Sequence, residues 1–266
     1  MFGLKDKVAL VTGGANGIGA AIVREFLKEG VKYVSILDLE EKSGIALAET
    51  LAATYGKDKV KFFKCDVTKD DELFAAFEKT ANANGGLDIV VNNAGIANDD
   101  IYKKEIEVNF TALVTSTLKA LELMRSDRGG KGGTVINVSS VSALALLSPT
   151  AFIYGATKAA GLHFTSSIGK EAYYSSTKVR TLSICFGATD TDLISDVRSF
   201  DEELTQKMKT IVKYDPLQTA EDAAKGVVKA YKTGDSGSIW LIWCKVQDIT
   251  DRVKKGYEIM AGDIFD

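Results

Sequence analysis

The sequence predicts an α/β fold, with a doubly wound parallel sheet of about seven strands and helices on both faces. One observation is that short, β-branched apolar runs alternate with longer amphipathic patterns along the whole chain. The other is that polar or glycine-rich motifs follow these runs, at the strand ends where open parallel sheets bind ligands. No repeat, low-complexity tract or linker interrupts the pattern, so we expect one domain over residues 1–266.

The expected elements follow one another in strict alternation. Strands are expected at 7–12, 33–37, 60–63, 87–91, 134–139, 179–185 and 238–243. Helices are expected at 19–30, 41–54, 70–83, 101–125, 152–172 and 219–232. After the sixth strand, residues 186–215 are expected to form a helical lid over a substrate, and residues 244–266 are expected to form a C-terminal tail.

Composition and charge exclude several classes of function. The net charge of -3 argues against a nucleic-acid surface, which needs a basic stripe. His163 is the single histidine, and the three cysteines have no metal-ligand spacing, so we expect no metal site. No apolar stretch approaches about 18 residues, and the N-terminus lacks the apolar core of a signal peptide. We therefore expect no membrane span and a cytoplasmic protein.

A glycine-rich turn follows the first strand directly. The residues Gly13-Gly-Ala-Asn-Gly17-Ile-Gly19 stand between the strand 7–12 and a helix. Glycines let the backbone turn tightly and approach a pyrophosphate, and the helix N-terminus supplies amide donors and a positive dipole. The spacing is Gly-x-x-x-Gly-x-Gly rather than Gly-x-Gly-x-x-Gly, and an ordinary strand-to-helix turn is the alternative interpretation.

The second strand ends on an acidic residue, Asp38. A carboxylate at this place can accept hydrogen bonds from the adenosine ribose diol and would repel a 2′-phosphate. No arginine stands next to Asp38 to reverse that preference. The residue therefore predicts NAD rather than NADP as cofactor, and the alternative is an aspartate that caps the helix beginning near Glu40.

The strand 134–139 is followed by the residues that carry the clearest chemistry. Ser139 and Ser140 stand at its end, and Tyr154 and Lys158 open the next helix. Because they are four residues apart, the phenol and the ammonium share one helix face. A nearby cation should lower the tyrosine pKa from its usual value of about 10. Such a tyrosine, beside a serine hydroxyl, can take a proton from an alcohol or return one to a carbonyl.

Spacing alone does not identify this pair. The pattern Tyr-x-x-x-Lys occurs three times, beginning at Tyr55, Tyr154 and Tyr174, and each could be a surface pair on a helix. The neighbouring strand end and serines favour Tyr154. A hydrolase that uses Ser140 and His163 is a further alternative, but no Gly-x-Ser-x-Gly turn surrounds the serine.

Taken in order, these motifs resemble the short-chain dehydrogenases/reductases over nearly the whole chain. The resemblance rests on Thr12-Gly-Gly-Ala-Asn-Gly-Ile-Gly19, Asn92-Asn-Ala-Gly95, Asn109, Ser140, Tyr154-x-x-x-Lys158 and Thr191. Stretches such as Ile36-Leu-Asp38, Val108-Asn-Phe-Thr and Gly237-Ser-Ile-Trp240 look closest to insect-type alcohol dehydrogenases and fifteen-hydroxyprostaglandin dehydrogenases. The resemblance implies a Rossmann-type fold and an NAD-dependent oxidoreductase that interconverts an alcohol and its ketone or aldehyde.

The resemblance also implies a catalytic tetrad and a cofactor site. Tyr154 would be the acid/base, and Lys158 would lower its pKa and hold the nicotinamide ribose. Ser140, rather than Ser139, would bind the reacting oxygen, and Asn109 would anchor a water that relays protons. The implied NAD contacts are Gly13, Asn16, Gly17, Ile18, Gly19, Asp38, Asp66, Val67, Asn93, Ala94, Gly95, Tyr154, Lys158, Gly187, Thr189 and Thr191.

The substrate is predicted to be an apolar, bulky secondary alcohol or its ketone. Candidate lining residues are Leu193, Ile194, Val197, Phe200, Met208, Ile211 and Tyr214 in the lid, Leu144, Leu146 and Phe186 on the other walls, and Tyr257, Met260 and Phe265 at the mouth. Each of them could instead be a core contact. Phe186 replaces the family's usual proline, and the interval from Ser140 to Tyr154 is slightly longer than usual, so the resemblance leaves the substrate open.

A homodimer or homotetramer is expected, because in this family the helices that correspond to 101–125 and 152–172 often pack against their symmetry mates. The alternative function is a catalytically idle NAD-binding or partner-binding protein on the same fold, since a fold does not imply an activity.

Overall fold

The computed structural model describes residues 1–145, 152–212 and 216–262, without the side chains of residues 208, 209, 211 and 212. One sheet of eight strands runs through the centre in the order β3-β2-β1-β4-β5-β6-β7-β8. Neighbouring strands are parallel except β7 and β8, which are antiparallel. The strands are β1 (Val8–Thr12), β2 (Tyr33–Asp38), β3 (Val60–Lys64), β4 (Ile89–Asn92), β5 (Gly133–Ser140), β6 (Val179–Phe186), β7 (Ser238–Trp243) and β8 (Lys245–Asp248). The predicted doubly wound α/β fold is confirmed.

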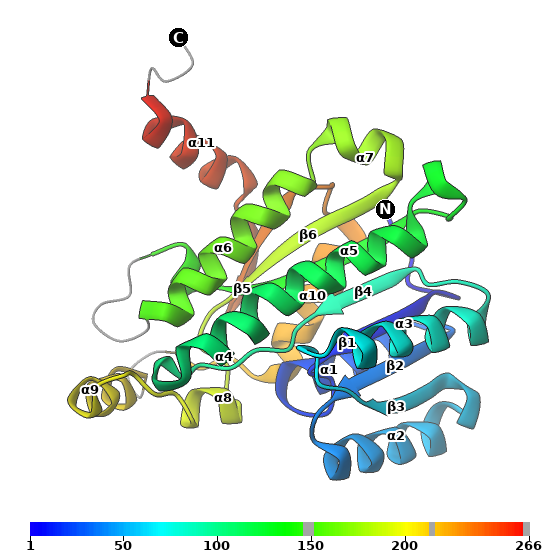
Figure 1. Cartoon of the computed structure of the whole chain (residues 1–266), viewed down its shortest axis with the longest axis horizontal. Coiled ribbons are helices and arrows are strands. Elements are labelled where there is room, and N and C mark those ends of the chain that lie inside the picture. Colours follow the sequence, from blue (N-terminus) through cyan, green and yellow to red (C-terminus); the bar gives the residue numbers. More distant parts are fainter. Residues whose placement is uncertain (146–151, 213–215, 263–266) are drawn as a thin grey trace.

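Helices cover both faces of this sheet (Figure 1). One face packs against α1, α2 and α10, and the other packs against α3, α5 and α6. The helices are α1 (Gly17–Lys28), α2 (Glu41–Tyr55), α3 (Asp70–Asn84), α4 (Tyr102–Ile106), α5 (Ala112–Met124), α6 (Phe152–Ile168), α7 (Glu171–Thr177), α8 (Asp192–Ser195), α9 (Glu202–Val212), α10 (Ala220–Thr233) and α11 (Thr250–Ala261). Among the described residues, no helix is both long enough and apolar enough to span a membrane.

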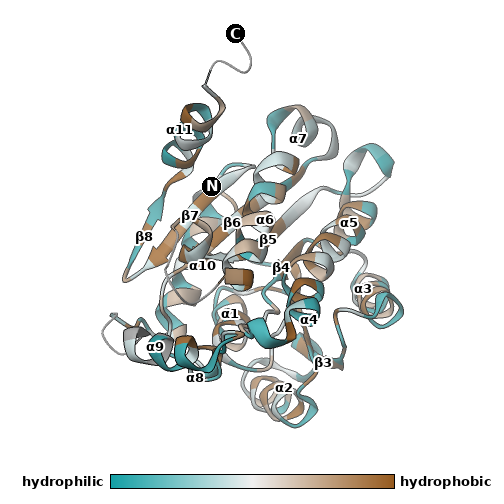
Figure 2. Cartoon of the chain, turned by 60° about the vertical axis from the view of Figure 1, so that its left-hand side comes forward, coloured by the Kyte–Doolittle hydropathy of each residue, from teal (hydrophilic) through white to brown (hydrophobic). Residues whose placement is uncertain are grey.

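The central strands are apolar because helices bury both of their faces. Every residue of β1 and of β6 is buried, and Figure 2 shows hydrophobic (brown) segments on the strands of the sheet. Consecutive residues of β5 show the two sides: Val135 packs with α3 and α5, whereas Ile136 packs with α1 and α10. This explains why the sequence has continuous apolar runs here instead of the polar–apolar alternation of a half-exposed sheet.

The C-terminal segment differs from the expected tail in its first part. Cys244 has a φ of 54°, which turns the chain back, so that β8 pairs antiparallel along β7. Three of the four β8 residues are exposed, as is common for an edge strand. Because β8 is short and polar, it lacks the apolar pattern by which the other strands are recognised, and the expected count of about seven strands becomes eight.

The segment expected as one helix at 101–125 is interrupted. A 3₁₀ turn (Asp99–Ile101) leads into α4, and a π-helical turn (Glu107–Thr111) joins α4 to α5. Asn109 lies in this wide turn and is buried. Such turns insert one extra residue into a helix and are frequent at functional sites.

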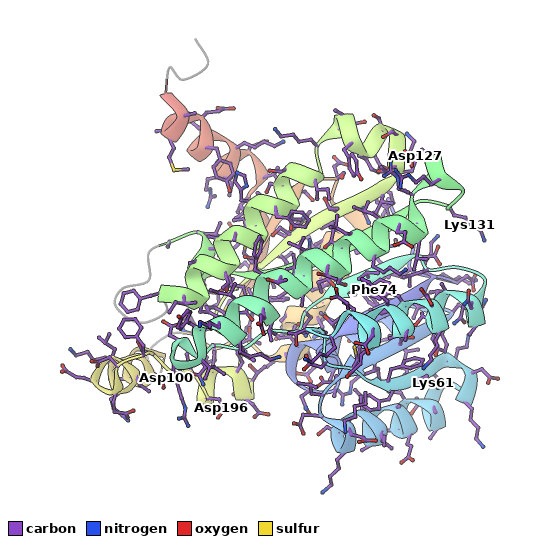
Figure 3. The ribbon with its side chains drawn as sticks, viewed as in Figure 1. Lys61, Phe74, Asp100, Asp127, Lys131 and Asp196 are labelled. Atoms are coloured by element: carbon purple, nitrogen blue, oxygen red, sulfur yellow. The ribbon has the colours of Figure 1, made fainter. Side chains whose placement is uncertain are left out.

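The expected lid region lies at the carboxyl edge of the sheet. There α8 and α9 stand beyond the strand ends, next to the chain that enters α4 (Figure 1). The two segments pair through a parallel bridge between Asn98 and Arg198. Figure 3 shows Asp100 and Asp196, labelled on these two segments, close to the same edge. Lid residues Met208, Ile211 and Tyr214, together with Leu146 and Phe265, fall outside the described side chains.

Candidate active site

In the glycine turn between β1 and α1, side chains would collide with neighbouring atoms at two of the glycine positions. Gly13 has a φ of 61°, and a Cβ there would lie 2.8 Å from the Cα of Ala94. A Cβ at Gly19 would lie 2.0 Å from the carbonyl oxygen of Gly13. Asn16 precedes the helix but makes no side-chain capping bond, which leaves the first amide groups of α1 open to an anion. These features fit the pyrophosphate of a dinucleotide.

Asp38 lies beside this turn at the end of β2. Its Oδ2 atom accepts a hydrogen bond from the Ala15 amide at 2.9 Å, and its Oδ1 atom accepts one from Glu40 at 3.1 Å. One bond of the carboxylate holds the glycine turn, and the other accepts from the Glu40 amide at the start of the next helix. Asp38 therefore both borders the expected cofactor site and caps a helix, as the two interpretations of this residue predict. A carboxylate oxygen has two acceptor positions, which leaves capacity for a ribose diol.

Several predicted cofactor residues use their side chains inside the fold. The amide of Asn93 donates to the carbonyl oxygens of Thr12 and Gly13, at 3.2 and 3.0 Å, and so holds the glycine turn. Val67 packs into the core, and the Thr189 hydroxyl donates to the carbonyl of Gly187. The side chains of these residues are already engaged within the protein, so they can contact a ligand only through their backbone N–H and C=O groups.

Asp66, Gly187 and Thr191 lie at the same carboxyl edge. Asp66 accepts hydrogen bonds from the Thr68 amide and hydroxyl and faces Lys104, and these interactions lower its pKa although burial opposes them. The Thr191 methyl group lies 3.2 Å from the Cβ position of Gly17, which places this threonine against the glycine turn. A Cβ at Gly187 would overlap the Trp243 indole, so glycine is required after β6.

Tyr154, Lys158 and Ser140 meet between α6 and the end of β5. The Lys158 ammonium lies 5.5 Å from the centre of the Tyr154 ring and donates to the Val138 carbonyl at 3.3 Å. The two serines differ: Ser139 donates to the Lys158 carbonyl, whereas Ser140 accepts a hydrogen bond from the Ser142 amide and lowers the pKa of the Tyr154 phenol. Ser140 is thus the serine beside the phenol.

The acid–base properties of this pair differ from the expectation. Burial raises the Tyr154 pKa to about 12, and the hydrogen bond with Ser140 offsets only part of that effect. Burial also lowers the Lys158 pKa to about 8. We expected the ammonium to lower the tyrosine pKa, but removal from water, which disfavours both charged forms, has the larger effect in the protein alone.

Asn109 reaches the same place from the π-helical turn. Its Oδ1 atom accepts from the Ile96 amide at 2.9 Å, and its Nδ2 atom donates to the Ile96 carbonyl at 2.8 Å. A Cβ at Gly95 would lie 3.2 Å from both the Asn109 Oδ1 atom and the Lys158 Nζ atom. Asn109 and Lys158 are therefore neighbours across Gly95, and a side chain there would be in tight contact with both.

Two buried acids near this site were not found from the sequence. Asp99 accepts hydrogen bonds from the amides of Phe152, Ile153 and Tyr154 and so caps α6 from a distant segment. Glu105, on α4, is fully buried, and its Oε1 atom accepts from the Asn98 amide at 3.0 Å. Neither acid belongs to a motif. In the sequence, these two acids differ from surface acids only in having several apolar residues nearby.

The chain matches the family model described as short chain dehydrogenase over residues 7–202. It is 31% identical over 230 residues to the human 15-hydroxyprostaglandin dehydrogenase [NAD(+)], covering 85% of this chain and 86% of the human one. The rat protein of the same name is 30% identical over the same coverage. The chain belongs to the short-chain dehydrogenase family of oxidoreductases.

Solved structures show the same fold for this short-chain dehydrogenase. A short chain dehydrogenase/reductase from Burkholderia phymatum in complex with NAD superimposes with a TM-score of 0.80 at 20% identity, covering 98% of this chain and 96% of the other. A 3-ketoacyl-(acyl-carrier-protein) reductase from Brucella melitensis complexed with NADH gives a TM-score of 0.76 at 23% identity, covering 90% and 97%. At these identities the likeness establishes the fold.

His163 is exposed on α6 and packs edge-on against Tyr257 with the ring centres 5.7 Å apart, so it is a helix residue, and the alternative of a hydrolase that uses Ser140 and His163 is not supported. Two of the candidate pocket walls of this short-chain dehydrogenase lie elsewhere. In Figure 1, α11 rises away from α8 and α9, and Met260 on it is 73% exposed. The described part of the C-terminal tail therefore does not close the mouth of the site. Phe186 packs into the core with the residues around α10 and is not a free pocket wall.

Proposed function

We propose that this short-chain dehydrogenase interconverts a secondary alcohol and its ketone with NAD as the cofactor. The observation that carries the proposal is the meeting of Ser140, Tyr154 and Lys158 at the strand edge that also holds the glycine turn and Asp38. The names of the 15-hydroxyprostaglandin dehydrogenases, which include NAD(+), support both the reaction and the cofactor.

The residues of the chain have separate tasks in this reaction. Bound NAD supplies the hydride acceptor. The glycine turn and the first amides of α1 would hold the pyrophosphate, and Lys158 would hold the ribose. Ser140 donates a hydrogen bond to the reacting oxygen, and Tyr154 receives the alcohol proton or, in the reverse direction, donates its own to the carbonyl. A phenol with the usual pKa of about 10 is neutral at pH 7, and burial raises the Tyr154 pKa further, so the protein alone holds Tyr154 as a proton donor.

An absorbance assay tests the reaction. Protein, NAD and a panel of secondary alcohols are mixed, and NADH formation is followed. The Tyr154→Phe variant is the control for contaminating activity, and fluorescence measures whether it still binds NADH. Turnover by the parent alone supports the proposal. NADH binding with no turnover of any alcohol or ketone supports the idle NAD-binding protein, the alternative function.

Asp38 provides a test of the cofactor. Its carboxylate should favour NAD through hydrogen bonds to the ribose diol and should repel the 2′-phosphate of NADP. We expect Asp38→Ala to lower the ratio of kcat/KM with NAD to kcat/KM with NADP, mostly because NAD binds more weakly. The ratio is measured with one alcohol at fixed ionic strength. A parent enzyme that uses NADP as well as NAD contradicts this role for Asp38.

The substrate proposed for the site is apolar. In the described part of the lid, Val197 is buried, and Phe200 packs against Phe152 at the start of α6 with the ring centres 5.4 Å apart. Among the lid cations whose side chains the structure describes, Lys207 is paired with Glu203 at 2.7 Å and Arg198 is exposed. A wall of this kind suits carbon chains better than a carboxylate or phosphate.

A series of alcohols tests this part of the proposal. Burial of one methylene gains about 0.8 kcal/mol, so three more carbons should raise kcat/KM by more than about tenfold. Linear and cyclic secondary alcohols of rising size are compared at saturating NAD. A flat series, or a maximum at the smallest alcohols, contradicts an apolar pocket without contradicting the reaction itself.

A further inference from the structure

The short segment that connects β4 to α4 is bonded to the expected lid region through its backbone. The Arg198 amide, in the lid region, donates to the Ala97 carbonyl at 3.0 Å, and the Asp99 amide donates to the Arg198 carbonyl at 2.9 Å. Because these two hydrogen bonds join backbone groups, they hold the chain of the lid region itself rather than one of its side chains. The position of Asp99 is therefore tied to the position of Arg198.

The side chain of Asp99 holds the first turn of α6. Its Oδ2 atom accepts hydrogen bonds from the amides of Phe152 and Ile153, at 3.1 and 3.3 Å, and its Oδ1 atom accepts one from the amide of Tyr154, at 3.2 Å. The residue is 2% exposed, so water has little access to these bonds. Both carboxylate oxygens are engaged, and a neutral amide side chain, which has one acceptor oxygen, cannot replace them.

Two further contacts join the same elements. The Glu105 Oε1 atom, on α4, accepts a hydrogen bond at 3.0 Å from the amide of Asn98, the residue before Asp99. The Phe200 ring, in the lid region, packs against the Phe152 ring at the start of α6, with the ring centres 5.4 Å apart. The lid region thus contacts the first turn of α6 directly, through the two rings, and indirectly, through Asp99.

We propose that Asp99 is a positioning residue that couples the lid region to Tyr154, so that a displacement of residues 197–200 is transmitted to the first turn of α6. The inference rests on the proposed function for its catalytic meaning, although the coupling itself needs no substrate. Misplacing a catalytic group by about 1 Å can cost about a hundredfold in rate, so a small movement of this turn matters. Because a coupling free energy is reciprocal, a change at either end must be felt at the other.

Hydrogen exchange of single backbone amides, followed by nuclear magnetic resonance of ¹⁵N-labelled protein, tests the coupling without substrate or cofactor. In Asp99→Asn one acceptor oxygen is lost, so amides at the start of α6 should exchange at least about tenfold faster. The substitution does not touch the bond from Arg198 to Ala97, yet in a coupled structure the Arg198 amide should also exchange at least about threefold faster. Asp100→Asn makes the same chemical change at the next residue, an exposed acid, and should leave all these rates as in the parent.

A pair of substitutions at Arg198 measures the same coupling from the lid region. Arg198→Pro removes the amide that donates to Ala97, whereas Arg198→Ala keeps it. Only the proline variant should therefore speed exchange of the Tyr154 amide. A parental exchange rate of the Arg198 amide in Asp99→Asn, or an equal change in Asp100→Asn, overturns the proposal. If Asp99→Asn does not fold, an unchanged Tyr154 amide in Arg198→Pro overturns it.

The alcohol assay connects the coupling to catalysis. We expect Asp99→Asn to lower kcat by about tenfold or more with NADH binding unchanged, because the first turn that carries Tyr154 loses its support while the glycine turn keeps its own. A cap with a purely structural role would lower only the Tm, so an unchanged kcat, measured well below the Tm of the variant, overturns the positioning role. Failure of the alcohol panel with the parent rejects the proposed reaction and leaves the exchange experiment decisive.

Discussion

Two tyrosine–lysine pairs in this protein have nearly the same local geometry. The Lys158 Nζ atom lies 5.5 Å from the Tyr154 ring centre, and the Lys178 Nζ atom lies 5.7 Å from that of Tyr174. Their surroundings differ. Lys158 is buried and donates to the Val138 carbonyl, whereas Lys178 is exposed at the end of α7, where β6 begins. One pair stands at the carboxyl edge of the sheet and the other at the opposite edge.

The comparison shows that contact between a lysine and a tyrosine ring is not by itself enough to alter the chemistry of the pair. Spacing of four residues is enough to bring a lysine over a tyrosine ring, and both pairs show it. Removal from water and a third charged group are needed to change the protonation of the two side chains, and the Tyr154 pair has both. A site is therefore defined by what converges on the pair from other elements.

The largest expected difference concerns the two phenols. Tyr154→Phe should lower kcat by on the order of a hundred- to ten-thousandfold, because the proton donor is lost, while NADH still binds. Tyr174→Phe and Tyr55→Phe remove hydroxyls from the other two matches and should behave like the parent. Steady-state kinetics with one good alcohol compares the three variants. Similar losses in all three would show that the comparison is wrong.

The next difference concerns how the helices of the two pairs begin. Asp99→Ala leaves the three amides at the start of α6 without their buried acceptor and should lower the free energy of unfolding by about 2 kcal/mol. In α7 the capping position makes no side-chain bond, and Glu171 is the exposed acid of the first turn. Glu171→Ala should cost only about 0.3 to 1 kcal/mol. Urea unfolding followed by circular dichroism measures both; equal losses would contradict the special role of Asp99.

A difference in pH dependence should follow from the two lysines. Lys158 has a pKa lowered to about 8, so the ammonium form is present below that pH and is lost as the pH rises through it. We expect kcat/KM for ketone reduction, which reports the free enzyme, to fall above about pH 8 by up to about tenfold per pH unit. Lys178→Ala should leave this profile unchanged. A parent profile that stays flat to pH 10 would remove Lys158 from the acid–base system.

The smallest effect is expected at Lys178 itself. Its φ of 54° is in the left-handed region, which costs a residue with a side chain about 1 kcal/mol. Lys178→Gly should relieve this strain and lose an exposed contact with Tyr174 worth about 0.5 kcal/mol. The net result should be a slight rise in Tm with unchanged activity. A clear fall in Tm would mean that the Tyr174–Lys178 contact contributes more than its exposure suggests.

The strands, the glycine turn and the catalytic pair could be predicted because each has a local pattern. Strand β5 contains the β-branched apolar residues Val135, Ile136 and Val138, and Tyr154 lies within about one helix turn of Lys158 in the next helix. Asp99 and Glu105 could not be predicted, because their importance arises only when α4 packs against α6. The raised Tyr154 pKa escaped prediction for the same reason: the sequence shows the neighbouring lysine but not the depth of burial.

Predictions for single cofactor contacts were limited in another way. Asn93 belongs to a recognisable motif, but sequence does not show that its amide is already used to hold the glycine turn. The strand β8 was missed because four mostly polar residues at an edge carry no apolar period. For Asn93 the deciding information is a hydrogen-bonding partner far away in the chain. For β8 it is the turn at Cys244, which folds the strand back onto β7.

The π-helical turn at Glu107–Thr111 makes the site depend on chain length as well as on residue identity. Each residue of a regular helix advances the direction of its side chain by about 100°. Deleting one residue from the wide turn would restore a regular helix and rotate α4 against α5 by about that angle. Glu105 would then turn away from α6, while Ser116 and Thr117 on α5 would keep their places in the core. An insertion or deletion of one residue here would therefore displace the buried Glu105 and Asn109 relative to α6, although Ser140, Tyr154 and Lys158 keep their places in the sequence.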